Sequence, residues 1–300
     1  MKNDSVKIIT KDTGIEGPTL LVMGAVHGNE PCGTLAIDMF EQYLAKGDIT
    51  LTCGKLVLIP ISNPEAHRQG IRFVDRNLNR FLFPRAQPIN YEDSIGNQLC
   101  AVLETADYLL DIHSYKSQGE PFVFLGNLSD KEIDFARALG VPHFVYGWQD
   151  VFKDSQARVK ESQGTTEYAR LFNAQALTLE CGNHTDARSV QVALSATINA
   201  MVHLGMVQIN NKALLPATSV QAEQCIQMKS RYERQAGWSL AAGWRTMNPV
   251  KQGDILAHSA DGQQTIKAAH DGYIVFPDKN APVGDKEWFF FGMPTALPKP

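Results

Sequence analysis

Several features of secreted and membrane proteins are scarce in this sequence of 300 residues. It contains only 5 Cys, with no Cys-x-x-Cys pair, so we expect no disulfide framework and a reducing compartment. No apolar run approaches the roughly 18 residues that a membrane span needs. The opening segment MKNDSVKIITKDTG lacks the apolar stretch of a secretory signal. We therefore expect a cytoplasmic protein that does not act at a membrane.

Positive charge is also limited. The chain has 28 Lys and Arg against 32 Asp and Glu, a formal net charge of -4. A nucleic-acid-binding protein would show a basic stripe, so we expect no nucleic acid partner. What the sequence does have is apolar residues, 44% of the total, enough for the large core of one big domain or of two.

Apolar runs alternate with helical patterns over the first two thirds of the chain. This alternation predicts an α/β fold with a mostly parallel (mixed) sheet covered by helices on both faces. Pro31 and Gly47 mark the start and stop of the first helix. The expected strands are 19–25, 55–62, 108–114, 121–126 and 175–182, and the other expected helices are 94–106, 131–140 and 186–204.

The pattern changes after residue 210. Residues 210–219 are typical of a linker, and short alternating runs separated by Gly-Asp and Asp-Gly follow. We expect residues 1–212 to form one domain and residues 220–300 a smaller β-rich domain.

Three polar motifs close predicted strands: HGNE, DIHS and LECG. Ligands collect at the carboxyl ends of parallel strands, so these motifs should share one rim of the sheet. Together His27, Glu30 and His113 provide two imidazoles and one carboxylate, with Gly28 expected to permit the turn between the first two. Such a set suits a catalytic zinc with one open position, and it also suits non-haem iron. HGNE or DIHS alone more often marks a structural histidine than a metal ligand, so the case depends on all three ligands lying on the same rim.

Two further residues near that rim carry expectations. Asp111 is expected either to be internal to the strand or to orient the imidazole of His113. Glu180 ends an apolar strand, where a raised pKa would suit a general base; the alternative is an edge carboxylate paired with Lys or Arg. Cys181 should point to the opposite side, into the core.

Arginines and asparagines gather in the stretch IRFVDRNLNRF, residues 71–81. A guanidinium offers a planar fork for a carboxylate or an oxyanion. The spacing of Arg72, Arg76 and Arg80 would also fit one solvated helix face. Gly70 and Pro84 favour an irregular loop, where binding groups often lie.

The sequence resembles the succinylglutamate desuccinylase/aspartoacylase family, zinc amidohydrolases related to the metallocarboxypeptidases. GAVHGNEPCG, NPEAHRQGIRFVDRNLNRFL, DIHS and TLECG occur in that family's order and approximate spacing. The resemblance implies a zinc-carboxypeptidase-like fold with a C-terminal β domain over the cleft. It also implies one zinc ion (Zn2+) per chain. By position, the zinc ligands are His27, Glu30 and His113, the general base is Glu180, the oxyanion arginine is Arg72, and the clamp for the substrate's α-carboxylate is Asn79 and Arg80.

The chain departs from the family pattern at three places. Asn77 stands where the family commonly has Asp, a residue expected beside the metal ligands, and the loss of its charge is expected to alter how the arginines are held. Glu167 follows Thr165 and Thr166 where aspartoacylases place an Arg, which would disfavour an N-acetylaspartate-like dicarboxylate and favour a neutral or amine-bearing substrate. Glu167 is equally compatible with a charge on a helix surface. A late Tyr of aspartoacylases is not evident, and Trp288 with three Phe stands in that region.

The resemblance therefore predicts an enzyme that hydrolyses the amide bond of a small N-acyl amino acid, with water activated by zinc and Glu180 as base. The alternatives are a carboxypeptidase-like peptidase and a non-catalytic zinc-binding protein. The sequence leaves open the acyl group, the amino acid, the use of another divalent metal and whether the chain forms a homo-oligomer.

Overall fold

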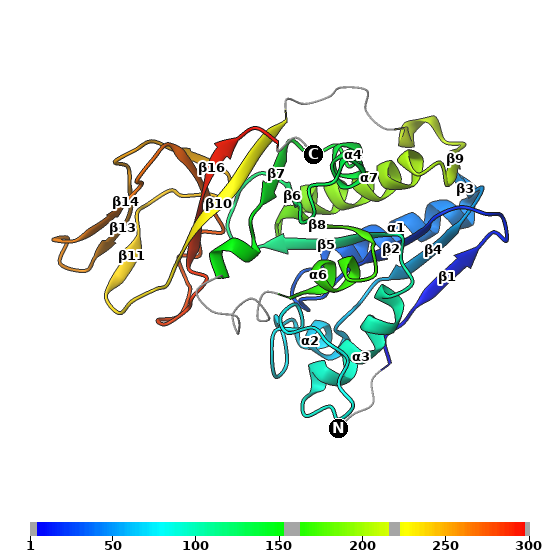
Figure 1. The fold of residues 1–300 in the computed structure, drawn as a ribbon, viewed down its shortest axis with the longest axis horizontal. Coiled ribbons are helices and arrows are strands. Elements are labelled where there is room, and N and C mark those ends of the chain that lie inside the picture. The colour runs from blue at the N-terminus through cyan, green and yellow to red at the C-terminus, as the bar shows by residue number, and fades with distance from the viewer. Residues whose placement is uncertain (1–4, 153–162, 216–222, 298–300) are drawn as a thin grey trace.

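An 11-stranded mixed sheet runs through the protein, in the order β1-β4-β2-β5-β8-β6-β7-β10-β16-β15-β12 (Figure 1). The structure is a computed structural model that describes residues 5–152, 163–215 and 223–297. The strands of this sheet are β1 (Ile9–Asp12), β2 (Thr19–Met23), β4 (Lys55–Ile59), β5 (Tyr108–Tyr115), β6 (Phe122–Phe124), β7 (His143–Tyr146), β8 (Gln175–Asn183), β10 (Gln224–Tyr232), β12 (Asn248–Val250), β15 (Gly272–Val275) and β16 (Phe289–Thr295).

Helices cover both faces of this sheet, which confirms the predicted α/β class. Side chains of α1, α4 and α7 share one apolar core with one face, and those of α3 and α6 share a second core with the other. A further pair of short strands, β3 (Ile49–Leu51) and β9 (Val207–Ile209), is antiparallel. The helices are α1 (Cys32–Lys46), α2 (Pro64–Gln69), α3 (Tyr91–Leu103), α4 (Asp130–Ala138), α6 (Thr165–Arg170) and α7 (Ala187–His203), with 3-10 turns η1 (Gln149–Phe152) and η2 (Lys212–Leu214).

The middle of the sheet is parallel. β2 pairs in parallel with β4 and β5, and β5 pairs in parallel with β8. These strands are buried on both faces, which explains why they read as continuous apolar runs. In the β5–β8 register His113 lies directly opposite Glu180, and the segment after β2 carries His27 and Glu30. The three polar motifs therefore do share one rim.

Part of the C-terminal region continues the same sheet, and part of it forms a separate one. β10 pairs in parallel with β7, and β16, β15 and β12 follow by antiparallel pairing. A second, three-stranded sheet of β11 (Trp238–Leu240), β13 (Ile255–Ser259) and β14 (Thr265–Lys267) lies at the far end of the molecule (Figure 1). It encloses its own core around Leu256 and Trp288. The predicted linker is described only as far as residue 215, and the expected start of the β region, residue 220, lies outside the described residues.

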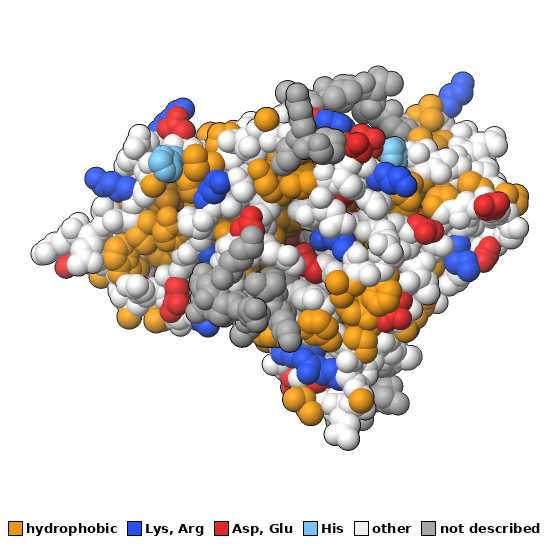
Figure 2. Space-filling model, in the orientation of Figure 1, with side chains coloured by type: hydrophobic (Ala, Val, Ile, Leu, Met, Phe, Trp, Pro, Cys, Tyr) orange, Lys and Arg blue, Asp and Glu red, His pale blue; other side chains and the backbone are white. Residues whose placement is uncertain are grey.

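Charged side chains are spread over the face shown in Figure 2. Lys and Arg stand there singly or in small groups among the described residues, with no basic stripe. Hydrophobic side chains gather over β11 and β13, where Ile255 is exposed and Trp244 is partly buried. None of the described helices is long and apolar enough to cross a bilayer.

Candidate functional site

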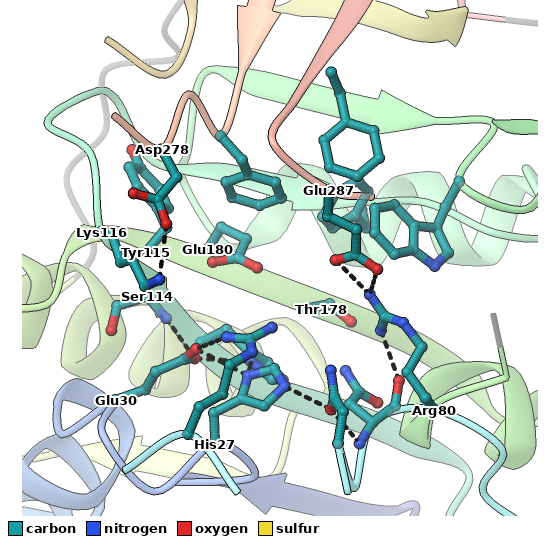
Figure 3. A pocket seen from close by; sticks show the side chains of 18 of the residues that line it. His27, Glu30, Arg80, Ser114, Tyr115, Lys116, Thr178, Glu180, Asp278 and Glu287 are labelled. Atoms are coloured by element: carbon teal, nitrogen blue, oxygen red, sulfur yellow. Dashed lines mark hydrogen bonds and ion pairs between the residues drawn. The ribbon is translucent and has the colours of Figure 1, made fainter. Parts of the chain in front are cut away.

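A cavity of about 530 Å³ opens at the carboxyl ends of β2, β5 and β8. Its lining comes from both the parallel part of the sheet and the C-terminal region, and Figure 3 shows part of it. Every site residue predicted from the sequence lines this cavity: His27, Glu30, Arg72, Asn79, Arg80, His113, Glu167 and Glu180.

The three predicted metal ligands converge on one point. Glu30 Oε1 lies 2.8 Å from His27 Nδ1, Glu30 Oε2 lies 2.9 Å from His113 Nδ1, and the two Nδ1 atoms are 3.2 Å apart. All three side chains are buried. Zinc ligands at about 2.0–2.1 Å in tetrahedral geometry lie about 3.3 Å from one another. The donor atoms therefore need to spread by only a few tenths of an ångström to hold such an ion.

The opposite nitrogen of each imidazole has a fixed partner. His113 Nε2 lies 3.0 Å from Asp111 Oδ2, as the sequence predicted. His27 Nε2 lies 3.0 Å from Asn77 Oδ1. These contacts direct both Nδ1 atoms toward Glu30, which is how protein partners commonly orient metal-binding histidines.

Gly28 is required for a reason other than the one predicted. Its φ is not in the left-handed region; Ala25, with φ of 48°, is the residue before the motif that adopts it. A Cβ at Gly28 would overlap backbone atoms of Ala66 and His67 in the middle of α2. The glycine therefore permits close approach of α2 to the ligand turn.

The arginine-rich stretch forms an irregular loop, as predicted, and not a helix face. The amide of Gly28 donates to Arg72 O at 3.2 Å, which ties the loop to the ligand turn. Arg72 Nη1 then reaches Glu30 Oε1 at 2.9 Å. Arg76 turns away to Asp93, and Arg80 turns toward the C-terminal region. Asn77 supports a predicted ligand, as expected, because its Oδ1 lies 3.0 Å from His27 Nε2. The same oxygen accepts from the Asn79 amide at 2.9 Å, so Asn77 also braces the loop before Arg80.

A buried carboxylate that the sequence analysis missed holds this loop. Glu92, near the start of α3, accepts from the amides of Val74, Asp75 and Arg76 at 2.7, 3.0 and 3.2 Å. It also accepts from Asn63 Nδ2 at 3.2 Å. The available signal was the pattern Asn-Tyr-Glu-Asp after a proline-rich loop, which marks a helix start with acidic residues in its first turn.

The neighbouring residue, Asp93, supports the same loop. Burial raises the pKa of Asp93, but hydrogen bonds from the Ile89 amide and Arg76, with the charge of Arg85, outweigh it and leave the pKa lowered. Asp93 is therefore an anion at the base of the arginine-rich loop.

Glu180 faces the ligand cluster across the cavity (Figure 3). Its side chain is buried and its Oε2 atom has no hydrogen-bond partner among the described residues. Burial raises the pKa of Glu180 well above its usual value, and the charge of Glu30 adds to this. The alternative of a Lys or Arg partner finds no support, since no ion pair of Glu180 occurs in the described chain. Cys181 lies in the core on the other face, as expected.

The electrostatics of the ligand cluster favour a neutral His27. Burial and the nearby charge of Arg72 lower the pKa of His27 to about 4. A neutral imidazole is the form that binds metal ions.

The predicted substrate-binding residues already have partners within the protein. Asn79 Oδ1 accepts from the Thr165 amide at 2.8 Å. Arg80 Nη2 donates to both carboxylate oxygens of Glu287, at 2.7 and 2.9 Å. Glu167 Oε2 accepts from the Gly164 amide at 3.0 Å at the start of α6, so Glu167 both caps a helix and lines the cavity.

Further residues of the cavity were assigned no role from the sequence, although His184 was expected near the rim. Ser114 Oγ lies 2.8 Å from His184 Nδ1, and the Ser114 amide donates to Glu30 at 3.1 Å. Lys116 pairs with Asp278 at 2.7 Å. Asp278 and Glu287 come from the C-terminal region, far along the chain from the residues that they meet. Trp288 is buried in the C-terminal core, whereas Phe290 reaches the cavity wall.

Comparison with known proteins identifies relatives of this chain. It is 30% identical over 115 residues to a probable aspartoacylase from Nostoc, a match that spans 35% of this chain and 38% of the relative. It is 28% identical over 207 residues to an N-alpha-acetyl-L-2,4-diaminobutyric acid deacetylase from Halomonas elongata, spanning 64% of this chain and 56% of the relative. Both matches thus cover less than two thirds of the relative's length.

Solved structures share the fold over nearly the whole chain. A succinylglutamate desuccinylase/aspartoacylase from Rhodobacter sphaeroides superposes with a TM-score of 0.76 at 17% identity, covering 97% of this chain and 89% of that one. The product-bound ectoine utilization protein EutE (DoeB) from Ruegeria pomeroyi has a TM-score of 0.70 at 21% identity, with 95% and 88% coverage.

The family model for the succinylglutamate desuccinylase/aspartoacylase catalytic domain matches residues 16–204. This range contains all of the predicted ligands, the carboxylate at residue 180 and the arginine-rich loop. The chain belongs to the succinylglutamate desuccinylase/aspartoacylase family.

Proposed function

We propose that this protein is a metal-dependent amidohydrolase that removes the acyl group from small N-acyl amino acids. One observation carries the proposal: the Nδ1 atoms of His27 and His113 lie 3.2 Å apart, and each is within 2.9 Å of an oxygen of Glu30. These three side chains line the same cavity as Glu180, a buried carboxylate with one unsatisfied oxygen. The names of the relatives, which include a deacetylase of an acetylated amino acid, agree with this reaction class.

One zinc ion per chain would be held by His27 Nδ1, Glu30 and His113 Nδ1. When bound there, zinc would polarise the amide carbonyl and lower the pKa of a water molecule toward about 7. The two-imidazole, one-carboxylate donor set suits zinc, and the hydrogen bonds to Asn77 and Asp111 preset the ring orientations.

Glu180 is the proposed general base. Its raised pKa and its missing hydrogen-bond partner leave it ready to take a proton from water. The water oxygen bonds to the acyl carbon, the carbon–nitrogen bond breaks, and Glu180 returns the proton to the departing nitrogen. Acid and amine are the products.

Arg72 is the proposed oxyanion group. Its guanidinium lies beside Glu30 at the edge of the ligand cluster and is 37% exposed toward the cavity. A single positioned donor of this kind contributes about 3 kcal/mol to transition-state stabilisation.

Substrate recognition is proposed for Asn79, Arg80 and Glu167. The substrate's α-carboxylate would face Asn79 and Arg80, whose Nε–H has no partner among the described residues. Glu167 places a negative charge on the same wall, which disfavours a dicarboxylate and suits a neutral or amine-bearing substrate.

The C-terminal region, proposed as residues 220–300, would roof the cleft over the catalytic part, residues 1–212. Phe276, Asp278 and Glu287 of this region line the cavity. A covered cavity fits small acyl amino acids better than the long peptides of a carboxypeptidase. A cytoplasmic location remains the prediction of the sequence.

Metal analysis combined with a hydrolysis screen tests the proposal. Purified protein should carry about one zinc per chain. It should hydrolyse members of a panel of N-acetyl and N-succinyl amino acids, measured as released amine, faster than it cleaves dipeptides. Glu180→Gln should keep the zinc and lose turnover, while Glu233→Gln, an exposed carboxylate outside the cavity, should change neither. Activity in the Glu180→Gln protein would remove Glu180 from the base role, and zinc without any hydrolysis would favour a non-catalytic protein.

A further inference from the structure

Arg80 forms an ion pair with Glu287, a carboxylate of its own chain. Both oxygens of Glu287 accept from Arg80 Nη2, and the Arg80 side chain is only 12% exposed. The two residues are 207 positions apart in sequence, so the pair joins the arginine-rich loop to the segment before β16. Figure 3 shows this pair on the opposite side of the cavity from His27 and Glu30.

The other cations of the cavity are matched in the same way. Lys116 pairs with Asp278 at 2.7 Å, and Arg170 Nε pairs with the buried Glu132 at 3.1 Å. Arg72 contacts Glu30. Among the described lining residues only Lys286, which is exposed to solvent, has no carboxylate partner. After the substrate's α-carboxylate has used the remaining Arg80 donors, no buried cation is left for a second carboxylate.

The wall beside Arg80 is aromatic. Phe124 lies edge-on to Trp148 with ring centroids 5.4 Å apart, and Phe290 packs on Trp148 at 5.3 Å. Phe276 contacts both phenylalanines, at 6.1 Å and 6.3 Å. The Arg80 guanidinium lies over Trp148 with 5.0 Å to the ring centroid. Phe124, Trp148 and Phe276 are only partly buried, and all four rings line the cavity.

We propose that Glu287 is a specificity-determining residue that neutralises the charge of Arg80. The aromatic side of the cavity then takes a large uncharged group of the substrate, preferably an aromatic one, and rejects a second carboxylate. The inference rests on the proposed function, which supplies the substrate class. Its claim concerns binding, however, and can be tested without turnover.

The physical argument is a comparison of two ligands that share an α-carboxylate. A second carboxylate has to displace Glu287 from Arg80, and this leaves a partly buried anion without its ion-pair partner, which is costly. An aromatic group instead loses water-exposed apolar surface against Trp148 and Phe276 and disturbs no ion pair. The negative charge of Glu287 persists at neutral pH, because Arg80 outweighs the effect of burial and holds the pKa of the Glu287 carboxyl below its usual value.

Calorimetric titration tests the preference directly. N-acetyl-L-phenylalanine and N-acetyl-L-glutamate are titrated into the zinc-loaded Glu180→Gln protein, with and without Glu287→Gln. The phenylalanine derivative should bind at least about tenfold more tightly when Glu287 is present. Glu287→Gln should reduce that ratio by about tenfold, chiefly by strengthening the glutamate derivative, since Arg80 then offers a charge-assisted hydrogen bond. Glu233→Gln, the matched control outside the cavity, should leave the ratio unchanged.

A merely structural role for Glu287 would weaken both ligands equally and leave the ratio unaltered, which would overturn the inference. A preference for the glutamate derivative with Glu287 in place, or no binding of either ligand, would also overturn it. Trp148→Leu provides an independent readout, because it should weaken only the phenylalanine derivative; equal weakening of both would contradict the proposed aromatic subsite.

Steady-state kinetics with Glu180 intact separate the two proposals. In the Glu287→Gln enzyme the change for the glutamate derivative should fall on KM, with kcat little altered. Binding as expected without hydrolysis of either compound would refute the proposed function and support the specificity role of Glu287.

Discussion

Replacement of Glu92 by Gln tests how the arginine-rich loop is positioned. Glu92 is fully buried, and its two oxygens accept four hydrogen bonds, from the amides of Val74, Asp75 and Arg76 and from Asn63 Nδ2. Glutamine has nearly the same shape, but only one of its two terminal atoms is an acceptor. The substitution therefore keeps two of these bonds, and its amide group faces the other two donors.

The expected cost follows from the number of bonds lost. A hydrogen bond to a charged group contributes about 1.5–3 kcal/mol, so the loss of two reduces the free energy of unfolding by about 3–6 kcal/mol. That is a large part of the about 5–15 kcal/mol that stabilises a typical domain. Because the loop carries Arg72 and Asn77, hydrolysis should also fall, by up to about 100-fold if these side chains shift by an ångström.

Urea unfolding followed by circular dichroism measures the first effect, and amine release measures the second under conditions where the variant is folded. Glu233→Gln serves as the control, because it removes the same charge from an exposed position. An unfolding free energy within about 0.5 kcal/mol of the parent protein, the range of ordinary surface changes, would refute the positioning role of Glu92.

Other substitutions probe the cluster and its surroundings. His113→Ala should lose most bound zinc, measured by plasma emission after dialysis; full occupancy would contradict its role as a ligand. Asn77→Asp should tighten zinc binding by about tenfold in chelator competition, because the bond to His27 Nε2 becomes charge-assisted; an unchanged affinity would contradict this contact. The lowered pKa of Asp93 should stabilise the fold above its unfolded pKa of about 3.9, and this contribution is lost as pH falls through the folded value. Below about pH 4 the urea midpoint of Asp93→Asn should therefore fall less steeply with decreasing pH than that of the parent protein. Equal slopes of midpoint against pH for the two proteins would contradict the lowered pKa of Asp93.

The sequence predicts well the elements that are determined by residues close together in the chain. β2, β5 and β8 are continuous apolar runs because both of their faces are covered, so each was visible as a buried strand. Parallel strands end at one edge, and this rule alone placed His27, His113 and Glu180 together. The irregular loop followed from Gly70 and Pro84.

The missed features depend on contacts between distant parts of the chain. No local pattern indicates that Glu92 bonds to three successive amides of the preceding loop, or that Glu287 meets Arg80. The role of Gly28 was misjudged for the same reason, since the constraint comes from the backbone of α2 and not from the turn itself. The continuation of the sheet from β7 to β10 also involves parallel pairing between segments about 80 residues apart, beyond the reach of periodicity.

The β7–β10 pairing has a consequence for dissection of the protein. A fragment that stops at residue 215 would leave the hydrogen-bonding edge of β7 open, along with the apolar side chains of Phe144 and Val145 that β10 faces. Bare strand edges recruit strands from other molecules. We expect such a fragment to aggregate rather than to behave as an isolated catalytic unit, so the two regions are best studied as one piece.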